Sequence, residues 1–245
     1  MSTKADRIFK AKMCEQSERY EDMVNIFKIT LSETVELDNE ERNLFSAAYK
    51  YLIGSRRTAY RALSAILSKE ESKEDKEKAA SRGGLIKSFK EKVVGEISKI
   101  CTEVTKIITD KLLPAATKEE SKLFYIKMKG DYYRYNCECL TGDELKSISE
   151  KARATYDEAS KSAEKSLAVT DPIRLGLSLN FSVFHYEILN DPTKACKIAK
   201  EAFDGAISQL EGLDDEHYKD TASILQLLRD NLTLWQNEGV EQAEN

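Results

Sequence analysis

The chain has 245 residues, of which 33% are charged and 41% are apolar, and its formal net charge is −5. This composition is typical of a folded, soluble protein and not of a disordered one. The negative charge argues against binding to nucleic acid or to an anionic membrane surface. No stretch approaches the roughly 18 apolar residues of a membrane span, and the N-terminal residues lack the apolar core of a signal peptide. We therefore expect a cytoplasmic protein.

The sequence has only 3 prolines and 10 glycines, too few to punctuate an all-β fold. Asp171-Pro172 and Asp191-Pro192 suit the start of a helix, with Asp as the cap and Pro in the first position. Hydrophobic spacing predicts an all-α fold with nine helices, over residues 4–17, 20–34, 39–71, 80–112, 118–140, 144–167, 172–190, 193–210 and 217–237. On the third of these, one apolar face is expected to contain Phe45, Ala48, Leu52, Ala59, Leu63 and Ile66.

The expected domain organisation is simple. We predict one helical domain over residues 1–237, followed by a short acidic tail at 238–245. Within the domain, the charged run at 68–78 and the pair Gly83-Gly84 indicate breaks between helices.

The cysteines do not indicate a disulfide framework. Their number is odd, and they stand at Cys14, Cys101, Cys137, Cys139 and Cys196. The one close pair has C-x-C spacing without a second pair, and the chain has only two histidines, so a zinc site lacks ligands. We expect reduced thiols, no bound metal and no cofactor.

A concentration of basic residues lies between Glu41 and Glu70, where the sequence has six Lys or Arg residues and no Asp or Glu. Lys50, Arg57 and Arg61 stand at i, i+7 and i+11, which places them on one face of a helix. Carboxylates one turn away normally balance such a stripe, and here they are absent. The stripe therefore predicts either a solvated helix face or a binding site for an anion.

A second basic pair lies in the segment FYIKMKGDYYRYN. Lys127 and Arg134 are again seven residues apart, with Asp131 one turn before the arginine and Tyr135 beside it. Four tyrosines and a phenylalanine indicate a partly desolvated environment, in which the planar fork of arginine binds phosphate oxygens in pairs. The alternative is an amphipathic helix whose tyrosines border the core.

Two later segments are unusually apolar, at residues 172–189 and 222–235. The first carries Leu179, Val183 and Glu187 on one face beside Asn180, and the second carries Leu227, Asn231 and Trp235 at four-residue spacing. Such helices are buried or line a groove. An asparagine there can bind both the N–H and the C=O of an extended peptide, or it can be satisfied within the core.

Four segments are distinctive together: RNLFSAAYKYLIGSRR, YIKMKGDYYRY, PIRLGLSLNFSVFHYEILN and YKDTASILQLLRDNLTLW. In their order and separation they resemble the signatures of the 14-3-3 family, and the resemblance extends over residues 3–237. It implies a cup-shaped homodimer whose protomers, each of nine antiparallel helices, carry one amphipathic groove. It also implies an adaptor that binds phosphoserine or phosphothreonine motifs of client proteins, without catalysis.

The resemblance assigns roles to the residues singled out above. The expected phosphate ligands are Lys50, Arg57, Arg134 and Tyr135. The expected peptide-backbone and groove contacts are Asn180, Glu187, Asn231, Trp235, Leu179, Val183 and Leu227, with Lys127 and Arg61 flanking the pocket. Residues 1–112 would supply the dimer interface and the basic wall of the groove, and residues 118–237 the apolar wall.

The N-terminal segment KAKMCEQSERYEDM resembles the dimer-forming segment of the family. The expected interface residues are Met13, Arg19, Asp22, Phe89, Lys92 and Glu96, of which Arg19 would pair with Glu96 and Asp22 with Lys92 across the two-fold axis. The partner would be a second copy or a paralogue. The protein is expected in the cytoplasm and, through its clients, also in the nucleus.

The sequence departs from the usual family pattern at three places. Ala59 stands where many members have a serine whose phosphorylation weakens the dimer, so that switch is absent. Phe89 stands where a tyrosine is usual, so the dimer is expected to lose one hydrogen bond. The connection near residues 70–84 is longer than is common and contains Gly83 and Gly84.

Two other classes of protein fit parts of the pattern. A tetratricopeptide-like scaffold would bind unphosphorylated peptides in a comparable groove. An enzyme would use Asp131 or Glu187 as an acid or base, but the sequence has no recognisable nucleophile arrangement and no glycine-rich phosphate loop. Dependence of peptide binding on phosphate would separate the adaptor from the scaffold.

Overall fold

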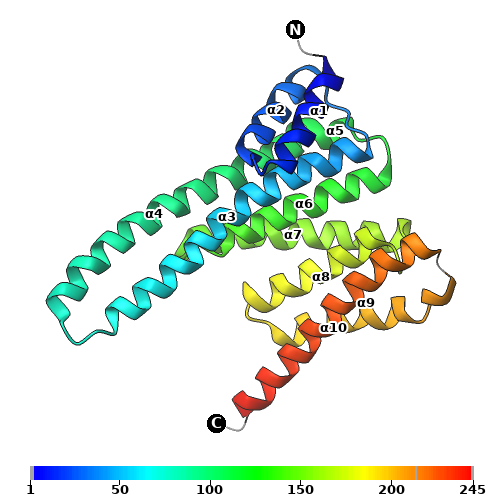
Figure 1. Ribbon diagram of the computed structural model, residues 1–245. Coiled ribbons are helices and arrows are strands. Elements are labelled where there is room, and N and C mark those ends of the chain that lie inside the picture. Colours follow the sequence, from blue (N-terminus) through cyan, green and yellow to red (C-terminus); the bar gives the residue numbers. More distant parts are fainter. Residues whose placement is uncertain (1–2, 213, 244–245) are drawn as a thin grey trace. The chain divides into compact units, whose positions relative to one another are not determined.

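The computed structural model describes residues 3–212 and 214–243, and the long elements within these ranges are nine helices (Figure 1). They are α1 (Lys4–Gln16), α2 (Tyr20–Glu33), α3 (Asn39–Glu71), α4 (Lys76–Ile107), α6 (Glu119–Cys137), α7 (Gly142–Ser166), α8 (Pro172–Glu187), α9 (Pro192–Ile207) and α10 (Asp215–Ala243). The short elements are η1 (Ile108–Leu112), α5 (Leu113–Ala115) and η2 (Leu210–Gly212). The described ranges contain no strand, which confirms the all-α class. None of the helices described is both long and apolar enough to cross a membrane.

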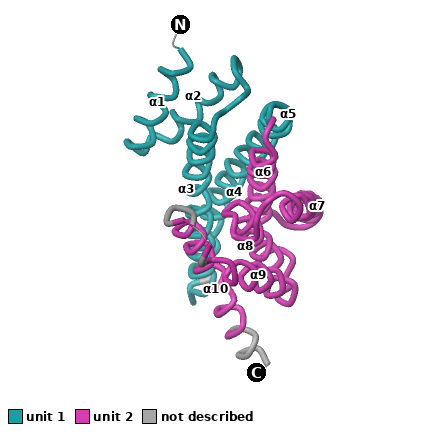
Figure 2. Tube along the Cα trace, turned by 90° about the vertical axis from the view of Figure 1, so that its right-hand side faces the viewer, with its two compact units in different colours: residues 1–116 teal, residues 117–245 magenta. Residues whose placement is uncertain are grey.

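The helices group into two compact units, residues 1–116 and 117–245, shown in Figure 2. In the first unit, α1 and α2 pack against each other and against α3, and α3 runs along α4. In the second unit, α6 packs on α7, and α8 contacts α6, α7, α9 and α10. The division falls between the two halves expected from the sequence, 1–112 and 118–237. A single domain over residues 1–237 stays a prediction.

The predicted helix starts at the Asp-Pro pairs are confirmed. Asp171 accepts hydrogen bonds from the first-turn backbone of α8, and Pro172 occupies the first helical position. Asp191 and Pro192 repeat this arrangement at α9, where the carboxylate accepts from the backbone N–H of Lys194 at 2.9 Å. In both cases the cap satisfies N–H groups that have no partner within the helix.

The connection between the two long helices of the first unit differs from the prediction. Only residues 72–75 join α3 to α4, so the predicted break at Gly83 and Gly84 is wrong, because both glycines lie within α4. The carboxylate of Asp75 accepts a hydrogen bond from the backbone N–H of Lys78 at 3.1 Å and starts the helix. The residues expected to form a long loop instead extend a helical hairpin. At the other end of the chain, α10 continues six residues beyond the predicted end at 237.

The apolar face predicted on α3 is buried only along its first half. Phe45, Ala48 and Leu52 are buried, whereas Leu63 is half-buried and Ile66 is 51% exposed. Helices α1 and α2 contribute cover near the start of α3, while α4 alone accompanies its far end (Figure 1). The second half of this face therefore reaches solvent in the unit.

All five cysteines are free thiols, as predicted. Cys101, Cys137 and Cys139 are buried, and Cys14 and Cys196 are half-buried. Burial raises the pKa of the Cys137 thiol to about 12, so it stays protonated at neutral pH. Among the described residues, no group of three or more His, Cys, Asp or Glu side chains is placed to hold a metal ion.

Candidate functional site

The polar centre of the second unit is Asp131, an α6 residue that is only 6% exposed. Its Oδ1 atom accepts hydrogen bonds from the Tyr156 hydroxyl of α7 at 2.6 Å and from the Asn180 amide of α8 at 2.7 Å. Its Oδ2 atom accepts from the Lys127 ammonium at 3.0 Å. One carboxylate therefore joins three helices and orients two of the predicted site residues. The sequence analysis marked Asp131 by its spacing from Arg134 and as a candidate acid or base, but not as the centre of such a network.

Tyr156, which the sequence analysis did not single out, is fully buried beneath this carboxylate. Its ring lies 5.3 Å from that of Phe181 and 5.6 Å from that of Phe184, centroid to centroid. Burial, and then the nearby Asp131 carboxylate, raise the pKa of Tyr156 well above its ordinary value. Its hydroxyl therefore stays protonated and donates to Asp131.

Arg134 is the buried cation of the site, and it is also 6% exposed. Its guanidinium lies 3.9 Å from the carboxylate of Asp131, one turn earlier on α6, and 3.7 Å from that of Glu138, the residue after the end of α6. Its Nε atom donates to the Tyr156 hydroxyl at 3.4 Å, and the guanidinium carbon lies 4.7 Å from the centroid of the Tyr135 ring. The side chain is thus fixed on several sides, as preorganised anion recognition requires.

Lys127 packs closely against α8 and pairs with Asp131 of its own helix. A Cβ atom added at Gly176 would lie 3.3 Å from the Cε atom of Lys127, so glycine leaves room for the lysine stem. Lys127, Arg134 and Asn180 all contact or approach the Asp131 carboxylate. That Lys127 flanks a phosphate pocket stays a prediction.

The two predicted backbone-binding asparagines differ in their surroundings. Asn180 is half-buried, and its donation to Asp131 fixes the amide while its carbonyl oxygen and second N–H make no other bond in the described part of the chain. Asn231 on α10 is also half-buried, and its amide makes no hydrogen bond with any described residue. Glu187, at the end of α8, is exposed. Both amides can still bond a ligand.

Trp235 is a core residue that joins α10 to α8. It is 6% exposed, and its ring stacks on that of Tyr186 with 4.7 Å between centroids. Leu179 and Val183 are half-buried and pack against the same hydrophobic cluster, whereas Leu227 is 52% exposed. The predicted apolar wall therefore contains both anchored and accessible side chains.

The basic stripe of the first unit lies on α3, where Lys50 and Arg61 are exposed and Arg57 is half-buried. Arg56 belongs to the same acid-free window but pairs with Glu21 at 2.5 Å and with Glu96 at 3.4 Å. Arg56 is therefore not part of the basic stripe, and its two ion pairs connect α3 with α2 and α4.

The predicted interface residues share the first unit. Met13 and Phe89 are 47% and 55% exposed, which is high for large apolar side chains. Arg19 pairs with Asp22 within the chain, and Lys92 is exposed. Glu96, the expected partner of Arg19 across the axis, accepts from Arg56 of its own chain.

A fixed buried arginine, a lysine and asparagine amides on adjacent helices define a helical binding protein for an anionic, peptide-like ligand. Comparison with known proteins gives the family. The family model described as 14-3-3 protein matches residues 10–236. The chain is 50% identical over 248 residues to 14-3-3-like protein B of Vicia faba, covering 100% of this chain and 94% of that protein. It is 48% identical over 235 residues to 14-3-3 protein beta/alpha of Homo sapiens, covering 96% and 93%.

The chain therefore belongs to the 14-3-3 family. Membership assigns to it the function of a phosphopeptide-binding adaptor and no enzymatic activity. The scaffold and enzyme alternatives are set aside on this ground. In the structure, the Asp131 carboxylate is engaged by three hydrogen-bond donors of its own chain, and it thereby holds Lys127, Tyr156 and Asn180 in place.

Proposed function

We propose that Lys50, Arg57, Arg134 and Tyr135 bind the phosphate of phosphoserine or phosphothreonine in client proteins. The observation that carries the proposal is the fixed position of buried Arg134 between two carboxylates, a tyrosine hydroxyl and the Tyr135 ring. A guanidinium held in this way loses little conformational entropy on binding, which favours a phosphate ligand. Two guanidinium groups, an ammonium and a phenol match a dianionic tetrahedral group better than a carboxylate. Phosphomimetic Asp or Glu should therefore bind poorly.

The peptide on either side of the phosphate is bound, on this proposal, by the second unit. Asn180 and Asn231 bond its backbone through amide atoms that no described residue occupies. Leu179, Val183 and exposed Leu227 contact its apolar side chains, while Glu187 and Trp235 support the asparagines. Lys127 and Arg61 flank the phosphate.

Fluorescence polarisation with a labelled Arg-Ser-x-pSer-x-Pro peptide tests the phosphate site. Lys50→Gln is expected to weaken binding about 10- to 150-fold, because a lost charge-assisted hydrogen bond costs about 1.5–3 kcal/mol. Lys50 is exposed and forms no ion pair with the described residues, so the substitution should leave the fold intact.

Lys69→Gln is the matched control, because Lys69 is an exposed lysine of the same helix, about 28 Å further along its axis. This variant and the wild type should bind equally. Equal binding of the unphosphorylated peptide to the wild type would contradict the phosphate-dependent site.

We further propose that a second copy of the chain covers exposed Met13 and Phe89 of the first unit, with Arg19–Glu96 and Asp22–Lys92 pairs across the axis. In a two-fold interface each substitution occurs twice, so Phe89→Asp is expected to raise the dimer dissociation constant about 100-fold. Sedimentation equilibrium distinguishes the 27.8 kDa chain from its dimer. Ile207→Asp, at a similarly exposed residue of the second unit, should leave the dimer unchanged. Equal dissociation of both variants would rule out this interface.

The proposed partners are thus phosphorylated clients together with a second copy or a paralogue. We place the protein in the cytoplasm and, through its clients, in the nucleus. Two linked phosphate sites would hold a doubly phosphorylated client more tightly through effective concentration.

A further inference from the structure

The Tyr156 hydroxyl of α7 lies between two charged α6 side chains, Arg134 and Asp131. It donates a hydrogen bond to the Oδ1 atom of Asp131 at 2.6 Å and accepts one from the Nε atom of Arg134 at 3.4 Å. The closest atoms of the guanidinium and the carboxylate are 3.9 Å apart, which is beyond hydrogen-bond length. The two charges are therefore joined through the hydroxyl and not bonded directly to each other.

This spacing leaves the terminal nitrogens of Arg134 available. The Nη2 atom lies 3.9 Å from the Asp131 carboxylate and the Nη1 atom lies 3.7 Å from that of Glu138, so neither nitrogen is hydrogen-bonded to these acids. Neither is among the described polar atoms that are enclosed without a partner, although the side chain as a whole is only 6% exposed. Both nitrogens therefore reach the surface of the unit, where the oxygens of an anionic ligand can accept from them.

The hydroxyl stands in the way of a direct bond between the two charges. The Oδ1 atom of Asp131 already accepts from Tyr156 at 2.6 Å and from Asn180 at 2.7 Å. Without the hydroxyl, the buried Nε–H group of Arg134 would lose its acceptor, which is costly. Opposite charges about 4 Å apart in a protein interior attract strongly, so the guanidinium would turn towards Asp131. A phosphate would then have to displace a carboxylate to reach the same nitrogens.

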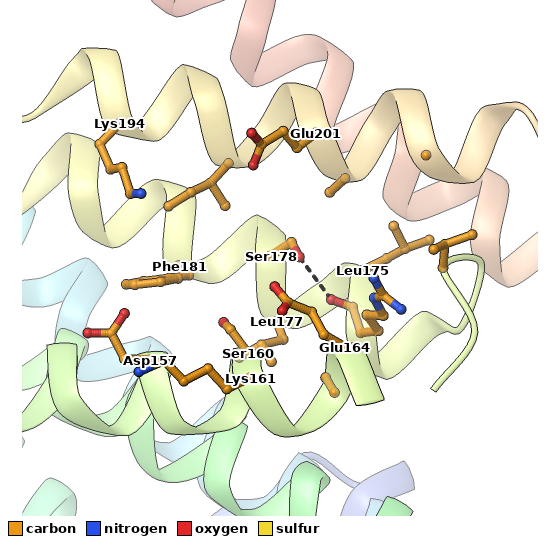
Figure 3. A pocket seen from close by; sticks show the side chains of 16 residues that line it. Asp157, Ser160, Lys161, Glu164, Leu175, Leu177, Ser178, Phe181, Lys194 and Glu201 are labelled. Atoms are coloured by element: carbon orange, nitrogen blue, oxygen red, sulfur yellow. Dashed lines mark hydrogen bonds between the residues drawn. The ribbon is translucent and has the colours of Figure 1, made fainter. Parts of the chain in front are cut away.

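The Tyr156 ring is held firmly enough to fix the position of its hydroxyl. It is fully buried, and the rings of Phe181 and Phe184 lie 5.3 Å and 5.6 Å from it, centroid to centroid. A Cβ atom added at Gly130 would lie 2.9 Å from a ring carbon, so α6 packs directly on the ring. Phe181 also lines a cavity of about 370 Å³ among α7, α8 and α9 (Figure 3), whereas Tyr156 does not. Water in that cavity therefore does not contact the hydroxyl.

We propose that the Tyr156 hydroxyl is a positioning group of the phosphate site, which holds Arg134 and Asp131 apart and thereby keeps the terminal nitrogens of the arginine for the client phosphate. The inference rests on the proposed function of Arg134, through which Tyr156 acts without touching the ligand itself. Asn180 keeps its own bond to Asp131 when the hydroxyl is removed. The effect of Tyr156 therefore falls on the phosphate and not on the peptide backbone.

Tyr156→Phe removes the hydroxyl and keeps the ring. In fluorescence polarisation with the labelled Arg-Ser-x-pSer-x-Pro peptide, the variant should have a Kd about tenfold higher than the wild type, since a charge-assisted hydrogen bond is weakened. Its affinity for the unphosphorylated peptide should not change, because that peptide has no phosphate for Arg134 to bind. A Kd equal to that of the wild type, or equal weakening for both peptides, would overturn the inference.

Tyr49→Phe controls for the loss of a buried tyrosine hydroxyl. Tyr49 is fully buried in the first unit, and its hydroxyl donates to the Glu103 carboxylate at 2.7 Å, so the same kind of bond is removed. This variant should lose a comparable amount of stability and bind the phosphopeptide as the wild type does. Equal weakening in the two variants would show that affinity follows stability and not the position of Arg134.

NMR measures the position of Arg134 without any ligand, through the exchange of its guanidinium protons with water. In Tyr156→Phe the terminal N–H protons should exchange more slowly than in the wild type, because they bond to Asp131. Unchanged exchange would show that the guanidinium does not turn, which contradicts the proposed role of Tyr156. If the wild type does not prefer the phosphorylated peptide, the proposed phosphate site fails as well. If the wild type prefers it and the variant binds equally, only the role of Tyr156 fails.

Discussion

Replacing Asp131 by asparagine is expected to lower the free energy of unfolding by about 3–5 kcal/mol, the cost of breaking a buried ion pair by removing one partner. The amide has nearly the same shape, and its oxygen can still accept from Tyr156 and Asn180. Its NH₂ group, however, replaces the Oδ2 atom that accepts from Lys127 at 3.0 Å. Buried Arg134 also loses one of its two neighbouring carboxylates. Urea unfolding measures the difference.

Asp204→Asn is the matched control. It makes the same chemical change at an exposed α9 residue whose carboxylate pairs with Lys200 at 2.9 Å, and it should cost no more than about 0.5 kcal/mol. Comparable losses in the two variants would show that the Asp131 network contributes no more than a surface pair. A double-mutant cycle with Tyr156→Phe should give a coupling energy of about 0.5–3 kcal/mol, since the two side chains share a hydrogen bond.

Gly130→Ala is expected to destabilise the protein although alanine favours helices. A Cβ atom at this α6 residue would lie 2.9 Å from the Cε1 atom of Tyr156 and 3.1 Å from two further ring atoms. The ring cannot retreat easily, because Phe181 and Phe184 lie close to it and its hydroxyl is bound to Asp131. Overpacking of this kind typically costs about 1–3 kcal/mol.

Gly205→Ala on α9 provides the opposite case, because a Cβ atom there meets nothing within 4 Å. Removing a helical glycine at an open position should stabilise the protein by about 0.5–1 kcal/mol. The two variants should therefore differ by about 1.5–4 kcal/mol in thermal or urea unfolding. Equal stability of the two variants would contradict the prediction, because it would show that the Tyr156 ring can move away from the added methyl group.

The helices were predictable because apolar spacing, Asp-Pro caps and the scarcity of glycine and proline all indicate the same elements. The break predicted at Gly83 and Gly84 was wrong, and the helix expected from residue 80 begins four residues earlier, at Lys76. A helical glycine costs only about 1 kcal/mol, and the cap at Asp75 together with packing of α4 along α3 offsets that cost. Whether a pair of glycines interrupts a helix depends on contacts with other helices, and these contacts cannot be read from the local composition.

In the candidate site, too, contacts within one helix could be predicted from the sequence, whereas contacts between helices could not. Spacing within α6 placed Lys127, Asp131 and Arg134 close together, and the structure agrees. The roles of Tyr156 and Asn180 around the Asp131 carboxylate depend on residues 25 and 49 positions away, brought together by the packing of α6, α7 and α8. No periodic pattern within one helix predicts such a meeting. The apolar segment around it and the family resemblance both pointed to Asn180, but neither predicted its bond with Asp131.

The native cysteines allow a distance between the two units to be measured by spectroscopy without an engineered cysteine. Cys14 lies in the first unit and Cys196 in the second, and both are half-buried, while the other three cysteines are buried. Thiol reactivity depends on access and on thiolate formation, so a nitroxide or fluorophore should attach first at these two positions. The distance between the two labels, measured by dipolar spectroscopy or energy transfer, would report how the units are arranged with and without a client.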